Sequence, residues 1–127
     1  MGTDFVTFPP TLTVRETIQR LRPVARDAEA LFYFYVVDEQ ERILGALSVR
    51  DLLAADDETL LEHAMATPVR TVTPDVSADE VAETMSKYDL LALPVSDPEG
   101  VLVGIITIDD VVDRLKPQPR HRRRRLR

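Results

Sequence analysis

The chain has 127 residues, of which 44% are hydrophobic and 30% are charged, proportions that are ordinary for one compact globular domain or two small interlocked halves. It contains no cysteine, which excludes disulfides, thiolate catalysis and thiolate metal sites. No apolar run approaches the roughly 20 residues of a membrane helix and no signal-peptide pattern opens the chain, so we expect a cytoplasmic protein.

Charge is divided unevenly along the chain. Residues 116–127 hold seven of the 16 basic residues, so residues 1–115 set nine basic residues against all 22 acidic ones, a formal charge of −13. Charge of this density destabilises the compact state through self-repulsion unless it is neutralised, and cations are the obvious neutralising partners. Residues 116–127 are predicted to form a disordered basic tail.

The first half, residues 3–56, has the pattern of a helix, two strands and a second helix. TVRE at Thr13–Glu16 is a capping box that opens an amphipathic helix, which we expect to be disturbed at Pro23. The apolar run Leu31–Val37 predicts a buried strand. After an acidic turn, Ile43–Ser48 predicts the second strand of a hairpin, and Ser48 caps a short helix.

The second half, residues 65–115, repeats this order. Val69–Val72 predicts a short strand, and SADE at Ser77–Glu80 is a second capping box that opens a helix. Leu90–Val95 predicts a strand, which is followed by a DPEG turn and a further strand over 101–107. Thr107 then caps the last helix.

The two halves share a motif at matched positions. Gly45, Ser48 and Asp51 recur 59 positions later as Gly104, Thr107 and Asp110, whereas the two capping boxes are offset by 64. The first copy therefore carries about five extra residues, which fall in the segment RPVARDAEA. We predict an α/β (α+β) fold of two pseudo-symmetric βαββα repeats, neither of which closes a core alone.

The shared motif suits a ligand cleft. A glycine in a strand allows a ligand or another backbone segment to approach closely. The hydroxyl residue caps a helix whose first N–H groups can bind an anion, and the aspartate can accept hydrogen bonds from a ribose diol. The alternative interpretation is that Ser48 and Thr107 act only as caps, and that the aspartates only favour the helix dipole.

These paired motifs resemble a tandem CBS domain, or Bateman module, over residues 3–115. The stretches FYFYVVDEQERILGALSVRDLL, EVAETMSKYDLLALPV and GVLVGIITIDDVVD are similar to the cytosolic CBS pair of MgtE-type magnesium transporters, as is the opening MGTDFVTFPPTLTV. The resemblance implies a regulatory module rather than an enzyme, which senses Mg²⁺ at the cytosolic face of the inner membrane and gates ion transport. It also implies helical and transmembrane domains as partners.

The resemblance also implies site residues. Acidic residues for Mg²⁺ would be Asp79, Asp89, Asp110 and Asp113, and each alone is equally readable as an exposed helix acid. For ATP or AMP, Tyr33 would contact the base, Arg50 the phosphates and Asp51 the ribose, with Ser48, Thr107 and Asp110 completing the motif positions. The chain has Leu90 where family members can place an aromatic residue, so one stacking face is lost, and Tyr33 is also readable as core.

A homodimer is a further expectation. The helices over 49–55 and 109–115 should contribute apolar side chains to a face-to-face disc, namely Leu52, Leu53, Val111, Val112 and Leu115.

Other functions are less well supported by the residues. His63 and His121 are isolated, and the chain has no Walker loop and no GxGxxG motif, so we do not expect an enzyme. A stand-alone adenine-nucleotide-binding protein is the first alternative. The second is a nucleic-acid- or membrane-associated protein acting through its arginine-rich tail. Nucleic acid is not an expected partner of the acidic residues 1–115.

Overall fold

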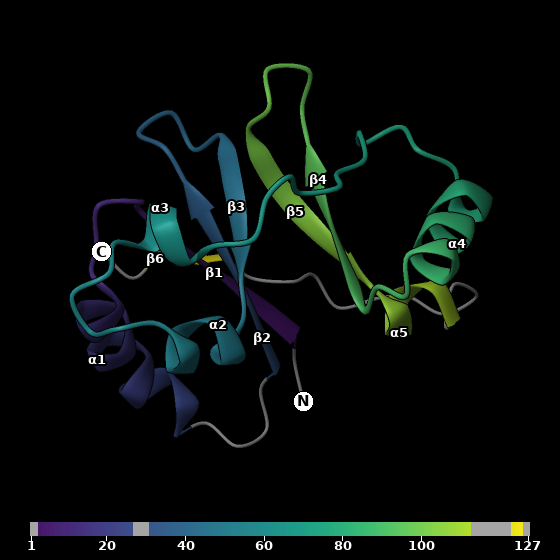
Figure 1. The fold of residues 1–127 in the computed structure, drawn as a ribbon. Helices are drawn as coiled ribbons and strands as arrows, with labels where there is room; N and C mark the ends of the chain where they lie inside the picture. Colours follow the sequence, from purple (N-terminus) through teal and green to yellow (C-terminus); the bar gives the residue numbers. More distant parts are fainter. Residues whose placement is uncertain (1–2, 27–30, 113–122, 126–127) are drawn as a thin grey trace.

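The computed structural model describes residues 3–26, 31–112 and 123–125. Its two sheets belong to the two repeats and lie side by side, with their hairpins adjacent at one end (Figure 1). In chain order the elements are β1 (Thr3–Phe8), α1 (Val14–Ala25), β2 (Leu31–Val37), β3 (Ile43–Leu47), α2 (Val49–Ala54), α3 (Leu61–Ala64), α4 (Ala78–Lys87), β4 (Ala92–Ser96), β5 (Leu102–Thr107), α5 (Ile108–Val112) and β6 (Arg123–Arg125).

The first repeat forms a mixed sheet with strand order β3-β2-β1-β6. Strand β1 runs parallel to β2, which forms an antiparallel hairpin with β3. One face of this sheet packs against the helices in a cluster that includes Phe8, Val14, Leu52 and Leu61. The burial of these aliphatic and aromatic side chains stabilises the repeat.

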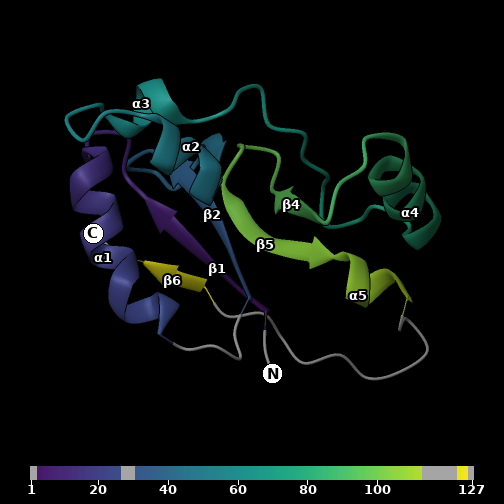
Figure 2. The same ribbon diagram turned by 60° about the horizontal axis from the view of Figure 1, so that its bottom comes forward.

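The second repeat has a smaller sheet, with two strands, but the same order of elements. Strands β4 and β5 form an antiparallel hairpin, and helices α4 and α5 lie beside it at one end of the molecule (Figure 2). Val81, Met85 and Leu93 form its buried cluster. The strand predicted at Val69–Val72 shortens to a single parallel bridge between Val72 and Val95.

Backbone register confirms the duplication. Phe8 pairs with Val36 in the first repeat, and Val72, 64 positions after Phe8, pairs with Val95, 59 positions after Val36. Each hairpin has a register shift at the same place, between Val36 and Val37 and between Val95 and Ser96. The two offsets inferred from the sequence are therefore both present in the structure.

The two hairpin turns are also equivalent. Glu41 and Gly100 both have positive φ, 66° and 88°. In each turn, an aspartate accepts two backbone N–H bonds, Asp38 in the first and Asp97 in the second. Asx turns of this kind are the usual use of aspartate in tight turns.

The repeats meet along a pseudo-twofold axis. The N–H of Ile43 donates to the carbonyl of Gly100 at 3.1 Å, and the N–H of Leu102 donates to the carbonyl of Glu41 at 3.0 Å. Arg42 and Val101 form the bridge between these bonds. Behind it, Phe5 and Tyr35 pack with Leu102 and Ile105 across the interface, so the repeats share this cluster while each also has one of its own.

Two predicted details differ from the structure. Helix α1 continues through Pro23 to Ala25, because proline in the last turn removes only one intrahelical bond and the following cap N–H bonds to the Val24 carbonyl. Arg123–Arg125 pairs in parallel with Phe5–Thr7 as strand β6. At these three residues the structure shows a strand where a disordered tail was predicted; the rest of that segment lies outside the described residues.

Candidate functional site

Each repeat places its motif aspartate at a helix start. Asp51 Oδ2 accepts the Ser48 N–H at 3.0 Å and Ser48 Oγ accepts the Asp51 N–H at 3.0 Å, which is a complete capping box. Asp110 Oδ2 accepts both the N–H and the hydroxyl of Thr107, at 2.8 and 3.2 Å. The first motif therefore caps its helix as predicted, whereas in the second motif both bonds run from Thr107 to the Asp110 carboxylate. The bond from the Ser48 N–H uses one carboxylate oxygen of Asp51, Oδ2.

A cleft opens beside the first of these caps, between the repeats. One part of about 250 Å³ is lined by Tyr33, Tyr35, Ala46 and Ser48, among others. An adjoining part of about 300 Å³ shares Tyr35 and Ala46 and reaches the second repeat; its further lining residues are Ala66, Pro68, Val69, Arg70, Tyr88, Leu90, Ala92 and Pro94. Apolar walls with a few polar groups are typical of small-ligand sites.

Two arginines flank this cleft. Arg50 is exposed in the first turn of α2, next to the Ser48 cap, and Arg70 lines the cleft wall. Within the described residues neither arginine has an ion-pair partner, whereas Arg15 and Arg42 pair with acids of their own repeat. In a strongly acidic body, two unpaired guanidinium groups at one cleft favour an anionic ligand.

From the sequence, neither Arg70 nor Tyr88 was assigned to a binding site; Tyr88 was expected to face the core, and it is 41% exposed. The guanidinium carbon of Arg70 lies 3.6 Å from the centroid of the Tyr88 ring, a cation–π contact. These residues are separated by helix α4, so their contact depends on the fold. The only signal in the sequence was an isolated basic residue in an acidic body.

The pseudo-symmetric counterpart of this cleft is filled by side chains. The positions equivalent to Ala46 and Val69 are Ile105 and Phe5, which are 6% and 2% exposed and belong to the core between the repeats. The position equivalent to Ala92 is Tyr33, which packs against the same core. Within the described part of the chain, the cleft that stays open is therefore the one beside the Ser48–Asp51 motif.

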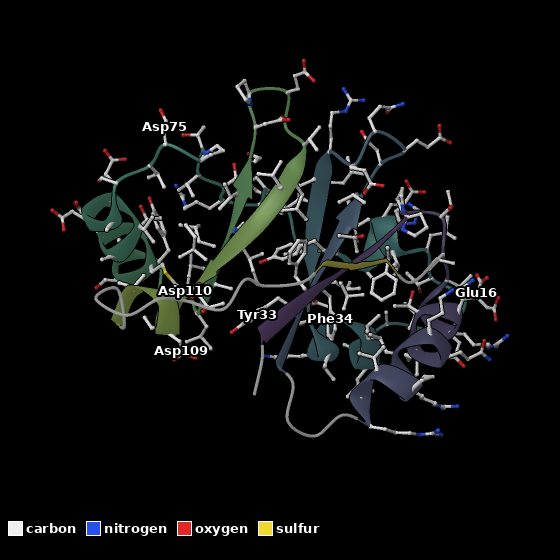
Figure 3. All side chains as sticks on the ribbon, turned by 180° about the vertical axis from the view of Figure 1, so that it is seen from behind. Glu16, Tyr33, Phe34, Asp75, Asp109 and Asp110 are labelled. Atoms are coloured by element: carbon white, nitrogen blue, oxygen red, sulfur yellow. The ribbon has the colours of Figure 1, made fainter. Side chains whose placement is uncertain are left out.

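Tyr33 lies where the cleft meets the second repeat. It is half-buried, it lines the cleft, and Figure 3 shows it on the side of the first repeat that faces Asp109 and Asp110 of α5. Burial raises the pKa of the Tyr33 hydroxyl, and the nearby Asp109 carboxylate raises it further. Tyr33 thus has both predicted features, a cleft position and a packing role, and Asp109 is a neighbour that the sequence did not identify.

The predicted magnesium ligands are spread along α4 and α5. Asp79 lies in the first turn of α4, Asp89 follows that helix with φ of 52°, and Asp110 caps α5. Among residues 3–26, 31–112 and 123–125, no three His, Cys, Asp or Glu side chains are grouped to hold a metal ion. Asp113 lies outside the described residues. The described carboxylates suit Mg²⁺ by ligand type but do not form an ion site within one chain.

Helices α1 and α2 leave an apolar groove on the outer face of the first repeat. Ile18, Leu21, Phe34, Val49 and Leu53 are among its lining residues, and Leu53 is 75% exposed. Leu52, which was expected at the dimer face, is instead 3% exposed and belongs to the repeat's own core. Val112 and Leu115 have no described side chain.

Membrane-span criteria are not met in the described part of the chain. Its longest helix, α1, has 12 residues, and none of its helices has the length and hydropathy that a span requires.

Two βαββα repeats around a pseudo-twofold axis, with a capped motif aspartate in each, define a tandem-repeat α/β module. The family model for the CBS domain matches residues 1–58 and again 61–117. The chain belongs to the CBS domain family and carries two copies of the domain, as the resemblance implied.

Similar proteins include a magnesium transporter. The chain is 45% identical over 118 residues to the magnesium transporter MgtE of Thermus thermophilus, covering 93% of this chain and 26% of that protein. It thus spans about a quarter of the length of this relative. Among solved structures, the cytosolic domain of the Mg²⁺ channel MgtE in complex with ATP has 47% identity and a TM-score of 0.78, covering 86% of this chain and 44% of that one. The soluble part of a magnesium transporter has 38% identity and a TM-score of 0.79, covering 89% and 44%.

Proposed function

We propose that this chain is the cytoplasmic regulatory module of a magnesium transporter, with a cleft that binds an adenine nucleotide. The single observation that carries the nucleotide assignment is the open cleft between the repeats. Beside it lie the capping aspartate Asp51 and Arg50, which has no ion-pair partner among the described residues. Support comes from the relative of 47% identity that was solved in complex with ATP. The module itself is regulatory and has no catalytic role.

In this proposal the phosphates of the nucleotide lie at the rim of the cleft, the ribose lies next to them, and the base lies deepest. Arg50, in the first turn of α2, binds the phosphates, where a guanidinium and helix N–H groups both favour negative charge. Asp51 binds the ribose diol through carboxylate lone pairs that the Ser48 cap leaves available. The base lies deeper, between Tyr33 and Leu90, on walls that are mostly apolar.

The first prediction concerns nucleotide affinity. Titration calorimetry should show one site per chain for ATP, and Asp51→Asn should weaken binding by roughly tenfold or more because it removes a charge-assisted hydrogen bond. Asparagine keeps an oxygen for the Ser48 N–H, so the cap survives. Leu90→Phe should strengthen binding by adding a stacking face. The matched control is Asp56→Asn, at an exposed acid in the loop after α2, which should bind nucleotide as the wild type does. A wild-type protein that binds neither ATP nor AMP would contradict the proposal.

A second candidate function is Mg²⁺ sensing, which the −13 charge of residues 1–115 favours. Because the described acids do not form a site within one chain, the ion would be held between this module and a second copy or another domain. Ion binding would then relieve repulsion between acidic surfaces and bring the modules together.

The second prediction tests this ion dependence by thermal melting. Millimolar-order MgCl₂ should raise the melting temperature more than NaCl of equal ionic strength, since screening relieves only diffuse repulsion while a bound ion acts locally. Asp89→Asn and Asp113→Asn should each reduce the Mg²⁺-specific increment and raise stability without Mg²⁺. Asparagine tolerates the positive φ of Asp89, so its backbone is not strained. Glu83→Gln serves as the control, and equal shifts in the two salts for all variants would count against the ion sensor.

The alternatives predict different outcomes. A stand-alone adenine-nucleotide-binding protein would be stabilised by nucleotide with no Mg²⁺-specific increment. A nucleic-acid- or membrane-associated protein would lose binding when residues 117–127 are deleted, and its binding would weaken steeply with salt.

A further inference from the structure

The contact between Arg70 and Tyr88 is a feature of the cleft that the proposed phosphate and ribose contacts do not use. Both residues line the larger part of the cleft, together with Leu90 and Ala92. At 3.6 Å from the ring centroid, the guanidinium carbon is at van der Waals contact with the face of Tyr88. A planar guanidinium reaches this distance by lying on the ring.

Several observations indicate that this arrangement faces a ligand. Arg70 is exposed, and within the described part of the chain it has no carboxylate partner. One face of its guanidinium lies on Tyr88, which is 41% exposed, and this contact limits the conformations of an otherwise flexible side chain. Arg70 is therefore an exposed planar cation at the cleft wall, placed there by its contact with Tyr88.

The position of Arg70 in the cleft decides which part of a nucleotide it meets. Ser48, the neighbour of Arg50 in the cap, lines the smaller part of the cleft, whereas Arg70 lines the larger part beside Leu90; both parts are lined mainly by apolar residues. Apolar walls suit a base rather than phosphates. Arginine planes are common stacking partners for nucleic-acid bases.

We propose that Arg70, held on Tyr88, stacks on the purine base and so recognises the base in the cleft. This inference rests on the proposed function. Leu90 offers only an aliphatic contact at this wall, and the guanidinium supplies the planar face. The ligand class is a purine nucleoside or nucleotide, whose base provides the π-face that a cation favours.

The test compares adenosine, AMP and ATP on wild type and variants by titration calorimetry. Arg70→Ala should weaken all three ligands by a similar factor, roughly tenfold, as expected for the loss of one stacking partner. Arg70→Lys should show a comparable loss, because lysine keeps the charge without the plane. Tyr88→Ala should weaken all three ligands in the same way, because it removes the ring on which Arg70 lies.

Lys87→Ala is the matched control. Its ammonium also lies over the Tyr88 ring, at 5.3 Å, but Lys87 is not among the residues that line the cleft, so its removal should leave affinity unchanged. An NMR readout adds direct evidence: the side-chain Nε–Hε signal of Arg70 should shift upfield on adding adenosine, through the ring current of the base.

The outcomes separate this inference from the proposed function. If wild type binds none of the three ligands, both are overturned. If wild type binds and Arg70→Ala binds equally well, or Arg70→Lys matches wild type, the stacking role alone is overturned. A loss that grows from adenosine to ATP would place Arg70 on the phosphates and also overturn it.

Discussion

Gly45 and Gly104 occupy equivalent positions in the two repeats, but their surroundings differ. A Cβ atom on Gly45 would lie 2.4 Å from the Met65 sulfur and 2.9 Å from the Met65 Cβ. Met65 is fixed there because its neighbour Ala66 exchanges two backbone hydrogen bonds with Ala46. A Cβ on Gly104 would meet nothing within 4 Å. The sequence predicted a close approach at both glycines, and the structure shows it only at Gly45, from the chain's own linker.

The third prediction follows from this contrast. Gly45→Ala should destabilise the protein by about 1–3 kcal/mol, the usual cost of overpacking. The added Cβ would crowd the Met65 Cβ, and the backbone there is held by the bridge between Ala66 and Ala46. Gly104→Ala should be nearly neutral and is the matched control. Urea unfolding measures both changes, and equal effects of the two substitutions would contradict the account.

Tyr33 and Asp109 give the fourth prediction, which concerns alkaline pH. The folded state holds the Tyr33 proton more tightly than the unfolded state, because burial and the Asp109 carboxylate both raise its pKa. This contribution to stability is fully present below the ordinary tyrosine pKa of about 10 and is lost as the pH rises through the folded value. Asp109→Asn should lower the pKa of Tyr33 and reduce this alkaline loss.

Tyrosinate absorbance and urea unfolding at pH values on either side of 10 provide the measurement. In a Tyr33→Phe background, Asp109→Asn should have no further effect on the alkaline dependence. An unchanged titration in the Asp109→Asn protein would show that the carboxylate does not act on Tyr33.

At the scale of elements, local patterns in the sequence predicted most of the fold. The capping box at Thr13 forms as expected, and at Ser77 the side-chain oxygen accepts the Glu80 N–H, which is one half of the second predicted box. These hydrogen bonds are predictable because they join residues only three apart. The hairpins form because their aspartate turns are equally local. Short strands are harder to predict, because pairing depends on partners that are distant in sequence: Val69–Val72 keeps one bridge, and β6 pairs with β1 from the far end of the chain.

The candidate site was predictable only in part for the same reason. Motif positions such as Ser48 and Asp51 follow from the repeat, and their capping geometry is local. Which of the two clefts is open depends on side-chain size at equivalent positions. Comparing Ala46 with Ile105 and Val69 with Phe5 at the known offsets would have indicated the answer. The Arg70–Tyr88 contact could not be predicted, because it joins two segments only after the repeats have folded.

At the scale of the whole molecule, the predicted homodimer would use the helices over 49–55 and 109–115, and the first of these borders the apolar groove between α1 and α2. Val49 and Leu53 are 56% and 75% exposed beside it, and exposed aliphatic groups at an apolar groove are typical of interaction sites. A dimer through this groove would be isologous, with the same patch on both copies.

The fifth prediction is that the chain sediments as a dimer at concentrations of tens of micromolar, on the order expected for weak modules. Leu53→Glu should give a monomer with little change in its own stability, because the side chain is exposed. Val103→Glu, at a 52% exposed apolar residue on β5, is the control and should remain dimeric. A monomeric wild type would contradict the prediction.

The reciprocal hydrogen bonds between the hairpin turns have a further consequence. Ile43 to Gly100 and Leu102 to Glu41 form the contact that two identical subunits make around a true dyad, so one chain here is equivalent to a covalently tethered dimer. The tether gives each repeat a high effective concentration of the other, and association no longer requires the halves to stay identical. One half is then free to fill its cleft with Phe5 and Ile105 and contribute to stability, while the cleft beside the Ser48 cap stays open for a ligand.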